Sequence, residues 1–133
     1  MKKMHFREAK ITPKKIGQFV TFWQRDLVTG KIKPFDVSDD FDLLAVSVSD
    51  KGKVGHFIFS KEVLLKENII SKEGKGGKRA MRVYPPWDKA ENKQAIATQK
   101  WQLRCFVGGP LEEAVLQYPQ GRDKACEGGV SVL

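Results

Sequence analysis

The sequence predicts a single α+β domain that is built mainly on an antiparallel sheet. Three observations predict it: the length of the chain, its β-rich first half, and a change of hydrophobic period after Ser60. The chain has 133 residues, of which 41% are hydrophobic and 30% are charged. This size and composition are typical of one globular domain that needs no disulfide or metal ion to fold.

The first half of the chain predicts an antiparallel meander over residues 17–60. The run QFVTFWQ in residues 18–24 is rich in β-branched and aromatic side chains, which is typical of a strand covered on both faces. Residues 42–48 and 56–60 give two further strands. The polar segments between these strands contain glycine and predict short turns.

The second half predicts two helices and one more strand. Residues 60–70 carry clustered apolar side chains, and Ser60 can cap a short helix there. A glycine-rich loop over residues 71–79 leads to a strand over residues 79–85. The strand ends at PPWD, because proline has no amide N–H to donate to a neighbouring strand.

A longer helix is expected in NKQAIATQKWQL, residues 92–103, because this segment is rich in helix formers. Asp88 can cap it, and Ile96, Lys100 and Leu103 recur at helical spacing. After Phe106 the chain changes character, with five glycines and two prolines in residues 107–133. We therefore expect a domain over residues 1–106 and a loosely ordered tail over residues 107–133.

The net charge of +8 is distributed unevenly along the chain. Residues 1–33 carry a net +7 and residues 72–104 a net +6, whereas residues 34–71 carry −3 and residues 105–133 carry −2. If the two basic segments share one face, the protein has the electrostatic footprint of a polyanion binder. The alternative is a well-solvated basic surface with no nucleic-acid partner.

The chain shows no signal for a membrane or for secretion. No apolar run approaches the ~20 residues that a membrane span requires. The basic N-terminal segment MKKMHFREAK is not followed by an apolar segment, so we expect no secretory signal and a cytoplasmic location.

The glycine-rich loop and the strand after it carry most of the candidate nucleic-acid-binding residues. Glycines let backbone amides approach phosphates, and Lys or Arg side chains neutralise them. Aromatic side chains can stack on unpaired bases at ~1–3 kcal/mol each. The alternative is that the loop is ordinary basic surface and that its aromatic residues pack in the core or in a turn. The candidates are Lys14, Lys15, Lys75, Lys78, Arg79, Arg82, Tyr84 and Trp87.

A cluster of four aspartates lies in PFDVSDDFD, just before the strand expected at residues 42–48. Metal-dependent nucleases hold Mg²⁺ with carboxylates placed in this way. The PD-(D/E)xK arrangement also needs an acid two residues before the lysine, and the residue two before Lys61 is Phe59. We therefore favour a turn formed by Ser38, Asp39 and Asp40, whose side chains bond nearby backbone amides. The cluster comprises Asp36, Asp39, Asp40 and Asp42.

No catalytic constellation stands out in the sequence. His5 and His56 have no ligand at metal-binding spacing, and Cys105 lies in an apolar stretch that predicts burial. The chain contains neither a GxSxG motif nor a Walker A loop. The sequence therefore gives no catalytic residue, no metal ligand and no cofactor.

Several segments in order resemble the MepB-like family, which is named after an accessory gene in a multidrug-efflux operon of bacteria. The resemblance runs from Phe6 to Phe106 and implies a single α+β domain, similar to nuclease-type folds and able to bind nucleic acid. The segments are AKITPKKIGQFVTFWQRD, PFDVSDDFDLLAV, GHFIFSKEVLL, GKRAMRVYPPWD and NKQAIATQKWQL.

The chain departs from the family pattern at both ends. Relatives carry a further N-terminal stretch, expected to be helical, before FREAKI, and in nuclease-like folds such a helix often supplies an acidic residue. The tail from Val107 onward does not resemble the end of the family. We therefore expect an N-terminally short member, consistent with a truncated or frame-altered gene product.

The favoured hypothesis is a monomeric, non-enzymatic domain that binds DNA or RNA with little sequence preference and does not bind membranes. If about five phosphates are neutralised, log K is expected to fall with log salt at a slope of roughly −3.5 to −4.5. Two alternatives stay open. One is a Mg²⁺-dependent nuclease that uses Asp36, Asp40 or Asp42 with Lys61, and the other is an adaptor that binds an acidic protein partner.

Overall fold

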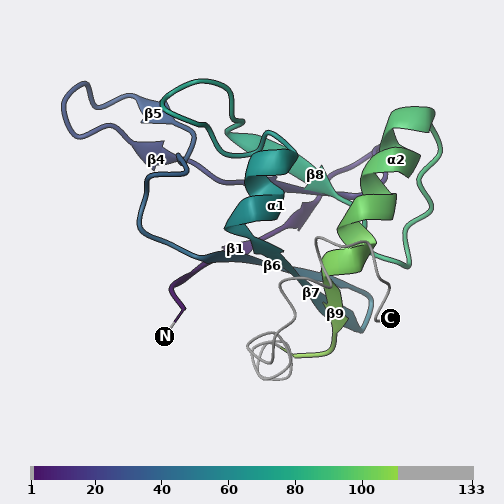
Figure 1. The fold of residues 1–133 in the computed structure, drawn as a ribbon. Coiled ribbons are helices and arrows are strands. Elements are labelled where there is room, and N and C mark those ends of the chain that lie inside the picture. Colours follow the sequence, from purple (N-terminus) through teal and green to yellow (C-terminus); the bar gives the residue numbers. More distant parts are fainter. Residues whose placement is uncertain (1, 111–133) are drawn as a thin grey trace.

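The computed structural model describes residues 2–110 and confirms the α+β class (Figure 1). Its larger sheet has four strands in the order β1-β6-β7-β9. The neighbours β6 and β7, and β7 and β9, are antiparallel, whereas β1 runs parallel to β6. The four strands are β1 (Met4–Glu8), β6 (Leu43–Asp50), β7 (Lys53–Ser60) and β9 (Phe106–Gly108).

A second, antiparallel sheet has the order β2-β3-β8, and a separate hairpin is formed by β4 and β5. The expected meander over residues 17–60 is therefore present only in its second part, as the β6–β7 hairpin. The β4–β5 hairpin lies between β3 and β6 in the chain, and β3 does not pair with β6. It pairs instead with β8, some 60 residues later. These strands are β2 (Lys10–Ile11), β3 (Gln18–Thr21), β4 (Gln24–Arg25), β5 (Ile32–Lys33) and β8 (Ala80–Val83).

β3 is covered on one face, and not on both as its composition predicts. Gln18 and Val20 are each 1% exposed, whereas Phe19 between them is 41% exposed. The side chains of a strand alternate between the two faces of its sheet, so only the first face of β3 meets the core.

The first helix, α1 (Lys61–Lys66), begins where the sequence predicts it. The Oγ of Ser60 accepts a hydrogen bond from the amide of Val63, which confirms Ser60 as the cap. The second helix, α2 (Lys93–Gln102), is capped by Asn92 and not by Asp88. The Oδ1 of Asn92 accepts from the amide of Ala95 at 2.8 Å, whereas Asp88 lies too far before the first turn to reach its amides.

The inner face of α2 also differs from the face that its apolar spacing predicts. Ile96 is 52% exposed and Lys100 is exposed, whereas Ala95 and Gln102 are buried. The helix therefore packs through small and amide side chains, and a short 3₁₀ turn, η1 (Leu103–Cys105), connects it to β9.

Two glutamine side chains attach α2 to β8, which is an edge strand of its sheet, and to the segment that follows β8. The Nε2 of Gln102 donates to the carbonyl oxygen of Arg82 at 2.9 Å, and its Oε1 accepts from the amide of Tyr84 at 2.9 Å. The Nε2 of Gln99 donates to the carbonyl oxygens of Pro85 at 3.0 Å and Asp88 at 2.7 Å. The amide of Gln102 thus bonds the edge of β8 as a neighbouring strand would.

The main core lies between the larger sheet and the layer formed by α1, α2 and the second sheet (Figure 1). Along β6, the side chains of Leu44, Val46 and Val48 enter this core, whereas Leu43 and Ala45 join a smaller cluster on the opposite face. Aromatic rings fill the main core, with Phe22 stacked on Phe35 at 4.3 Å between centroids and Phe57 edge-on to Phe106 at 5.2 Å. This core packs the larger sheet against the second sheet, which contains β8, and against α2.

The expected tail begins at Val107, and its first two residues complete β9, where Val107 pairs with His56. Residues 111–133, which include most of the segment PLEEAVL, lie outside the described residues. Within residues 2–110, none of the helices has the length and apolar character that crossing a bilayer demands.

Replacing Gln102 by leucine is expected to lower the free energy of unfolding by about 2–4 kcal/mol, because the amide of Tyr84 and the carbonyl of Arg82 lose their partner in a buried place. Urea unfolding followed by circular dichroism measures the change. Gln94→Leu, at an exposed position of the same helix, is the control and is expected to change stability by less than about 0.5 kcal/mol. Equal stabilities for the two variants would contradict the role given to this amide.

Candidate nucleic-acid interface

A groove runs between β8 and α2 and consists of two adjoining hollows of about 300 Å³ and 350 Å³. The two hollows share four lining residues and therefore adjoin, and together they are named here the β8–α2 groove. The shared residues are Arg82, Tyr84, Asn92 and Ala95.

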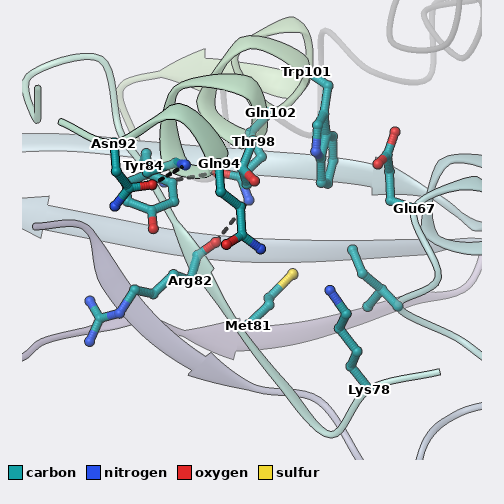
Figure 2. Close-up of a pocket in the computed structure, with 12 residues that line it drawn as sticks. Glu67, Lys78, Met81, Arg82, Tyr84, Asn92, Gln94, Thr98, Trp101 and Gln102 are labelled. Atoms are coloured by element: carbon teal, nitrogen blue, oxygen red, sulfur yellow. Dashed lines mark hydrogen bonds between the residues drawn. The ribbon is translucent and has the colours of Figure 1, made fainter. Parts of the chain in front are cut away.

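Side chains from both walls point into the hollow of about 300 Å³ (Figure 2). Gln94 and Trp101 descend from α2, and Lys78 and Met81 rise toward them from the chain that enters and forms β8. Polar, cationic and aromatic groups thus face one hollow, which suits a ligand with both charge and ring surfaces.

The other part of the groove is lined on one side by the loop between β2 and β3, which carries Lys14 and Lys15. Arg82 holds this loop. Its Nη1 donates to the carbonyl oxygens of Ile16 and Gly17 at 3.2 Å each, and its Nη2 donates to the Oγ1 of Thr12 at 2.5 Å. The guanidinium therefore positions the two lysines through the loop.

Gly17 allows this loop to lie against the groove wall. A Cβ at this position would lie 2.8 Å from the ring of Tyr84, and the φ angle of +86° is one that other residues rarely adopt. The close approach of the loop to Tyr84 therefore requires glycine here.

The structure brings five of the eight predicted nucleic-acid-binding residues together. Trp87 instead packs against the core, edge-on to Phe106 at 6.1 Å between centroids. This agrees with the alternative interpretation, in which the aromatic residues pack in the core. Lys75 and Arg79 are exposed but lie outside the groove lining. The five that line the groove are Lys14, Lys15, Lys78, Arg82 and Tyr84.

The lysines of the groove have exposed side chains that no carboxylate neutralises within residues 2–110. The acidic residues of the lining are Glu67 and Glu91, one in each hollow. Four cationic residues against two acidic residues leave the groove with a positive balance, which favours an anionic ligand.

Sequence reasoning missed the contribution of α2 to the groove. Gln94, Thr98 and Trp101 line it and recur at the i, i+4, i+7 spacing of one helix face. That spacing was a usable signal, but the apolar spacing of Ile96 and Leu103 drew attention to a different face. The ring of Trp101 also contacts Phe59 at 5.6 Å between centroids, which fixes one of its edges in the core.

The glycine-rich loop, residues 71–79, does not offer its amides to a ligand as the sequence suggests. The amide of Gly74 donates to the Oδ1 of Asp36 at 3.0 Å, and the amide of Gly77 donates to the Oδ1 of Asn68 at 3.0 Å. The amide of Lys78 donates to the carbonyl oxygen of Ile69 at 3.0 Å. The loop is therefore pinned to its surroundings and presents side chains.

The acidic cluster does form a turn, but the side chains that bond its backbone amides are those of Asp36 and Asp39 and not that of Asp40. The Oδ2 of Asp36 accepts from the amide of Ser38 at 3.0 Å, and the Oδ2 of Asp39 accepts from the amide of Asp36 at 2.7 Å. The Oδ1 of Asp36 also accepts from the Oγ of Ser71 at 2.6 Å, so the turn holds the start of the glycine-rich loop.

Lys61, the lysine of the nuclease alternative, is bonded within the same turn. Its Nζ donates to the carbonyl oxygens of Val37 at 2.9 Å and Asp39 at 2.5 Å, and lies 4.7 Å from the centre of the Phe41 ring. These contacts give its ammonium group a structural role.

The two remaining aspartates of the cluster meet the N-terminal segment. Asp40 forms an ion pair with the Nζ of Lys3, and the Oδ2 of Asp42 accepts from the amide of Lys3 at 2.8 Å. Across residues 2–110, no three His, Cys, Asp or Glu side chains are grouped so that they could hold a metal ion. The acidic cluster thus acts as a set of hydrogen-bond acceptors for the fold.

Fold and groove together define a small α+β protein with a basic, aromatic-lined depression between a sheet edge and a helix. The model of the MepB-like family matches residues 1–108, and the chain belongs to this family, as its sequence segments indicate. A crystal structure of MepB is similar to it, with 38% identity and a TM-score of 0.75, over 79% of this chain and 70% of that chain. No curated protein is similar enough to this chain to count as a relative.

Acidification tests the role of Asp36. The Oγ of Ser71, the amide of Gly74 and Ser38 hold the pKa of Asp36 well below its usual value of 3.8. In the unfolded chain this carboxyl takes up a proton at a higher pH than in the folded protein. Its contribution to stability is therefore complete well above pH 3.8 and is lost as the pH falls from about 5 toward 2.

Asp36→Asn is thus expected to lower stability at neutral pH and to make it depend less on pH between about 5 and 2. Ser71→Ala keeps the carboxyl but removes its first donor, and is expected to give an intermediate pH dependence. Urea unfolding at a series of pH values measures both. A wild-type pH dependence in Asp36→Asn would contradict the assignment.

Proposed function

We propose that this protein binds nucleic acid through the β8–α2 groove, with little sequence preference and without catalysing a reaction. One observation carries the proposal. Lys14 and Lys15 come from the first basic segment of the sequence and Lys78 from the second, yet all three line one groove together with Tyr84 and Trp101. A polyanion site requires that the two basic segments share one face of the protein, and this lining supports that arrangement.

Charge supports a polyanion as the ligand. The ammonium groups of the three lysines are exposed and have no carboxylate partner within residues 2–110, so a phosphate can pair with each without displacing a bond of the fold. Each phosphate that is neutralised releases condensed counterions, which gives binding a strong dependence on salt.

Ring and amide groups support nucleic acid over a plain polyanion. Tyr84 and Trp101 offer aromatic surface beside the lysines, and stacking tolerates every base because every base has a π-face. Asn92 and Gln94 add side-chain amides that can donate to phosphate or base oxygens. No repeated pattern of base-reading side chains lines the groove, which agrees with binding that tolerates sequence.

The proposal assigns binding and no chemistry to this protein. The carboxylates that would serve a metal-dependent nuclease accept hydrogen bonds within the acidic turn or from Lys3, and Lys61 donates to that turn. These groups support the walls of the site and lie outside its lining.

Reversing the charges of the groove is expected to weaken binding and to flatten its salt dependence. Lys14→Glu/Lys15→Glu removes two phosphate contacts, so the slope of log K against log salt becomes shallower by about 1.8 for duplex DNA. Lys51→Glu/Lys53→Glu, at exposed positions in the β6–β7 turn and at the start of β7, lies outside the groove lining and changes the net charge by the same amount. Fluorescence anisotropy of labelled oligonucleotides at several salt concentrations measures both variants.

The control is expected to keep most of the affinity and nearly the wild-type slope. Equal losses in the two variants would show that net charge, and not the groove, governs binding. No binding by the wild type at low salt would overturn the proposal and direct the search to protein partners.

Tryptophan fluorescence separates a nucleic-acid ligand from an acidic protein partner. Stacking on Trp101 is expected to quench the emission when a single-stranded oligonucleotide is added, and heparin of equal charge is expected to leave it nearly unchanged. Trp101→Phe is expected to remove the difference while Trp23 and Trp87 still emit. The same response to heparin and to the oligonucleotide would favour a site for acidic surfaces in general.

A further inference from the structure

The β4–β5 hairpin and its turn, residues 24–33, form an arm that stands away from the helices and carries two adjacent apolar side chains at its tip (Figure 1). Leu27 is 102% exposed and Val28 is 93% exposed. The other large apolar side chains on the surface of the described residues are exposed by only 41–56%. Two neighbouring apolar side chains fully in water, at the end of a projecting element, indicate a contact with something outside the chain.

Hydrogen bonds hold the tip of the arm in one conformation. The Oδ1 of Asp26 accepts from the amides of Val28 at 2.8 Å and Thr29 at 2.9 Å, and the amide of Gly30 donates to the carbonyl oxygen of Asp26 at 2.9 Å. The bonds from Thr29 and Val28, together with Lys33, lower the pKa of Asp26 to about 2, so the carboxylate that organises the turn is charged at neutral pH. The apolar side chains are thus presented on a preorganised turn.

Cations flank the apolar tip on both strands of the arm. Arg25 lies on β4, where its Nη1 donates to the carbonyl oxygen of Gly30 at 2.8 Å, and Lys31 precedes β5 on the other side. Lys33 ends β5 and pairs with Asp26 at 3.3 Å. The arm therefore carries a positive balance around two apolar side chains.

The base of the arm is joined to the loop that leads into the groove. A Cβ at Gly77 would lie 2.8 Å from the Cβ of Pro34, so the two segments are in direct contact. The next residue, Lys78, lines the β8–α2 groove. The base of the arm therefore lies beside the segment that brings Lys78 to the groove.

We propose that the arm is a wedge that inserts Leu27 and Val28 into the minor groove of duplex DNA and partly unstacks a base step. This inference rests on the proposed nucleic-acid binding. Arg25 and Lys31 contact the phosphates on the two sides of the inserted tip. Apolar wedges of this kind bend the duplex toward the major groove and let it follow more of the protein surface.

The dimensions and charge of the arm favour DNA over other occupants. Two side chains are too few for a stable protein interface, which needs about 800 Å² on each partner. An interfacial membrane anchor needs the broader apolar face of an amphipathic helix or a lipid chain. A wedge needs only one or two apolar side chains between flanking cations, and the minor groove is about 6 Å wide, enough for a narrow turn.

A duplex that carries 2-aminopurine at a central TA step tests the wedge. Wild-type protein is expected to raise the fluorescence of the probe, because unstacking relieves its quenching. Leu27→Ser/Val28→Ser is expected to remove the rise and to weaken binding about tenfold, while the slope of log K against log salt stays close to the wild-type value. Ile96→Ser, at another exposed apolar position, is the control and is expected to behave as the wild type.

The outcomes separate this inference from the proposed function. If the wild type binds the duplex but the tip variant binds equally well with the same rise in fluorescence, the wedge is wrong and the groove stands. If the wild type binds a single-stranded oligonucleotide but not the duplex, the wedge is wrong and the proposed function stands, whereas binding to neither overturns both. If the tip variant loses binding only to vesicles of phosphatidylserine and phosphatidylcholine, the arm is a lipid contact and the inference is overturned. Both substituted side chains are exposed, so circular dichroism is expected to show an unchanged fold.

Discussion

The side-chain amide of Gln102 is the contact on which the geometry of the groove depends. β8 is an edge strand, and an edge presents unpaired amides and carbonyls that must find partners where they are buried. Gln102, which is 1% exposed, bonds the carbonyl of Arg82 and the amide of Tyr84 with one planar group. Because both bonds must be made at once, the amide fixes the distance and the rotation of α2 relative to β8. Trp101, Gln94 and Thr98 then face β8 across a gap whose width is set by hydrogen bonds, and apolar contacts alone would define it less sharply.

The segregation of charge along the chain has a structural explanation. The acidic segment, residues 34–71, places its aspartates in a turn where they accept hydrogen bonds from backbone amides, from Ser71 and from Gln24. Because most of these carboxylates accept hydrogen bonds from other groups of the fold, most of the surface lysines form no ion pair with a carboxylate of residues 2–110. Asp36 links the turn to the glycine-rich loop, which carries Lys75 and Lys78. The carboxylates that resemble a metal site in the sequence are thus part of the support that holds cations in place.

Most local features could be predicted from the sequence, and the long-range ones could not. The β6–β7 hairpin and the cap at Ser60 follow from alternation and from a short polar side chain before a helix. β1 was missed because its half-exposed residues show little alternation and its parallel partner lies some 40 residues away. The inner face of α2 was misassigned because apolar spacing does not register a helix that docks through glutamine amides. In the groove, charge alone predicts Lys14 and Arg82, and only the structure shows that Arg82 donates its hydrogen bonds to the loop that carries Lys14.

The number of free cations limits how strongly the surface can hold a polyanion. Arg82 is committed to the β2–β3 loop, and Lys33 pairs with Asp26, so neither counts fully toward phosphates. The groove alone then offers three lysines, which corresponds to a salt slope of about −2.7 on duplex DNA, and two further cations of the arm would bring it to about −4.5. Single-stranded ligands are flexible enough to stack in the groove without reaching the arm, whereas a duplex follows the arm only if it bends. Under the proposed function, the same surface would bind both forms of nucleic acid through different sets of cations, and the steepness of the salt dependence would show how much of the surface each form uses.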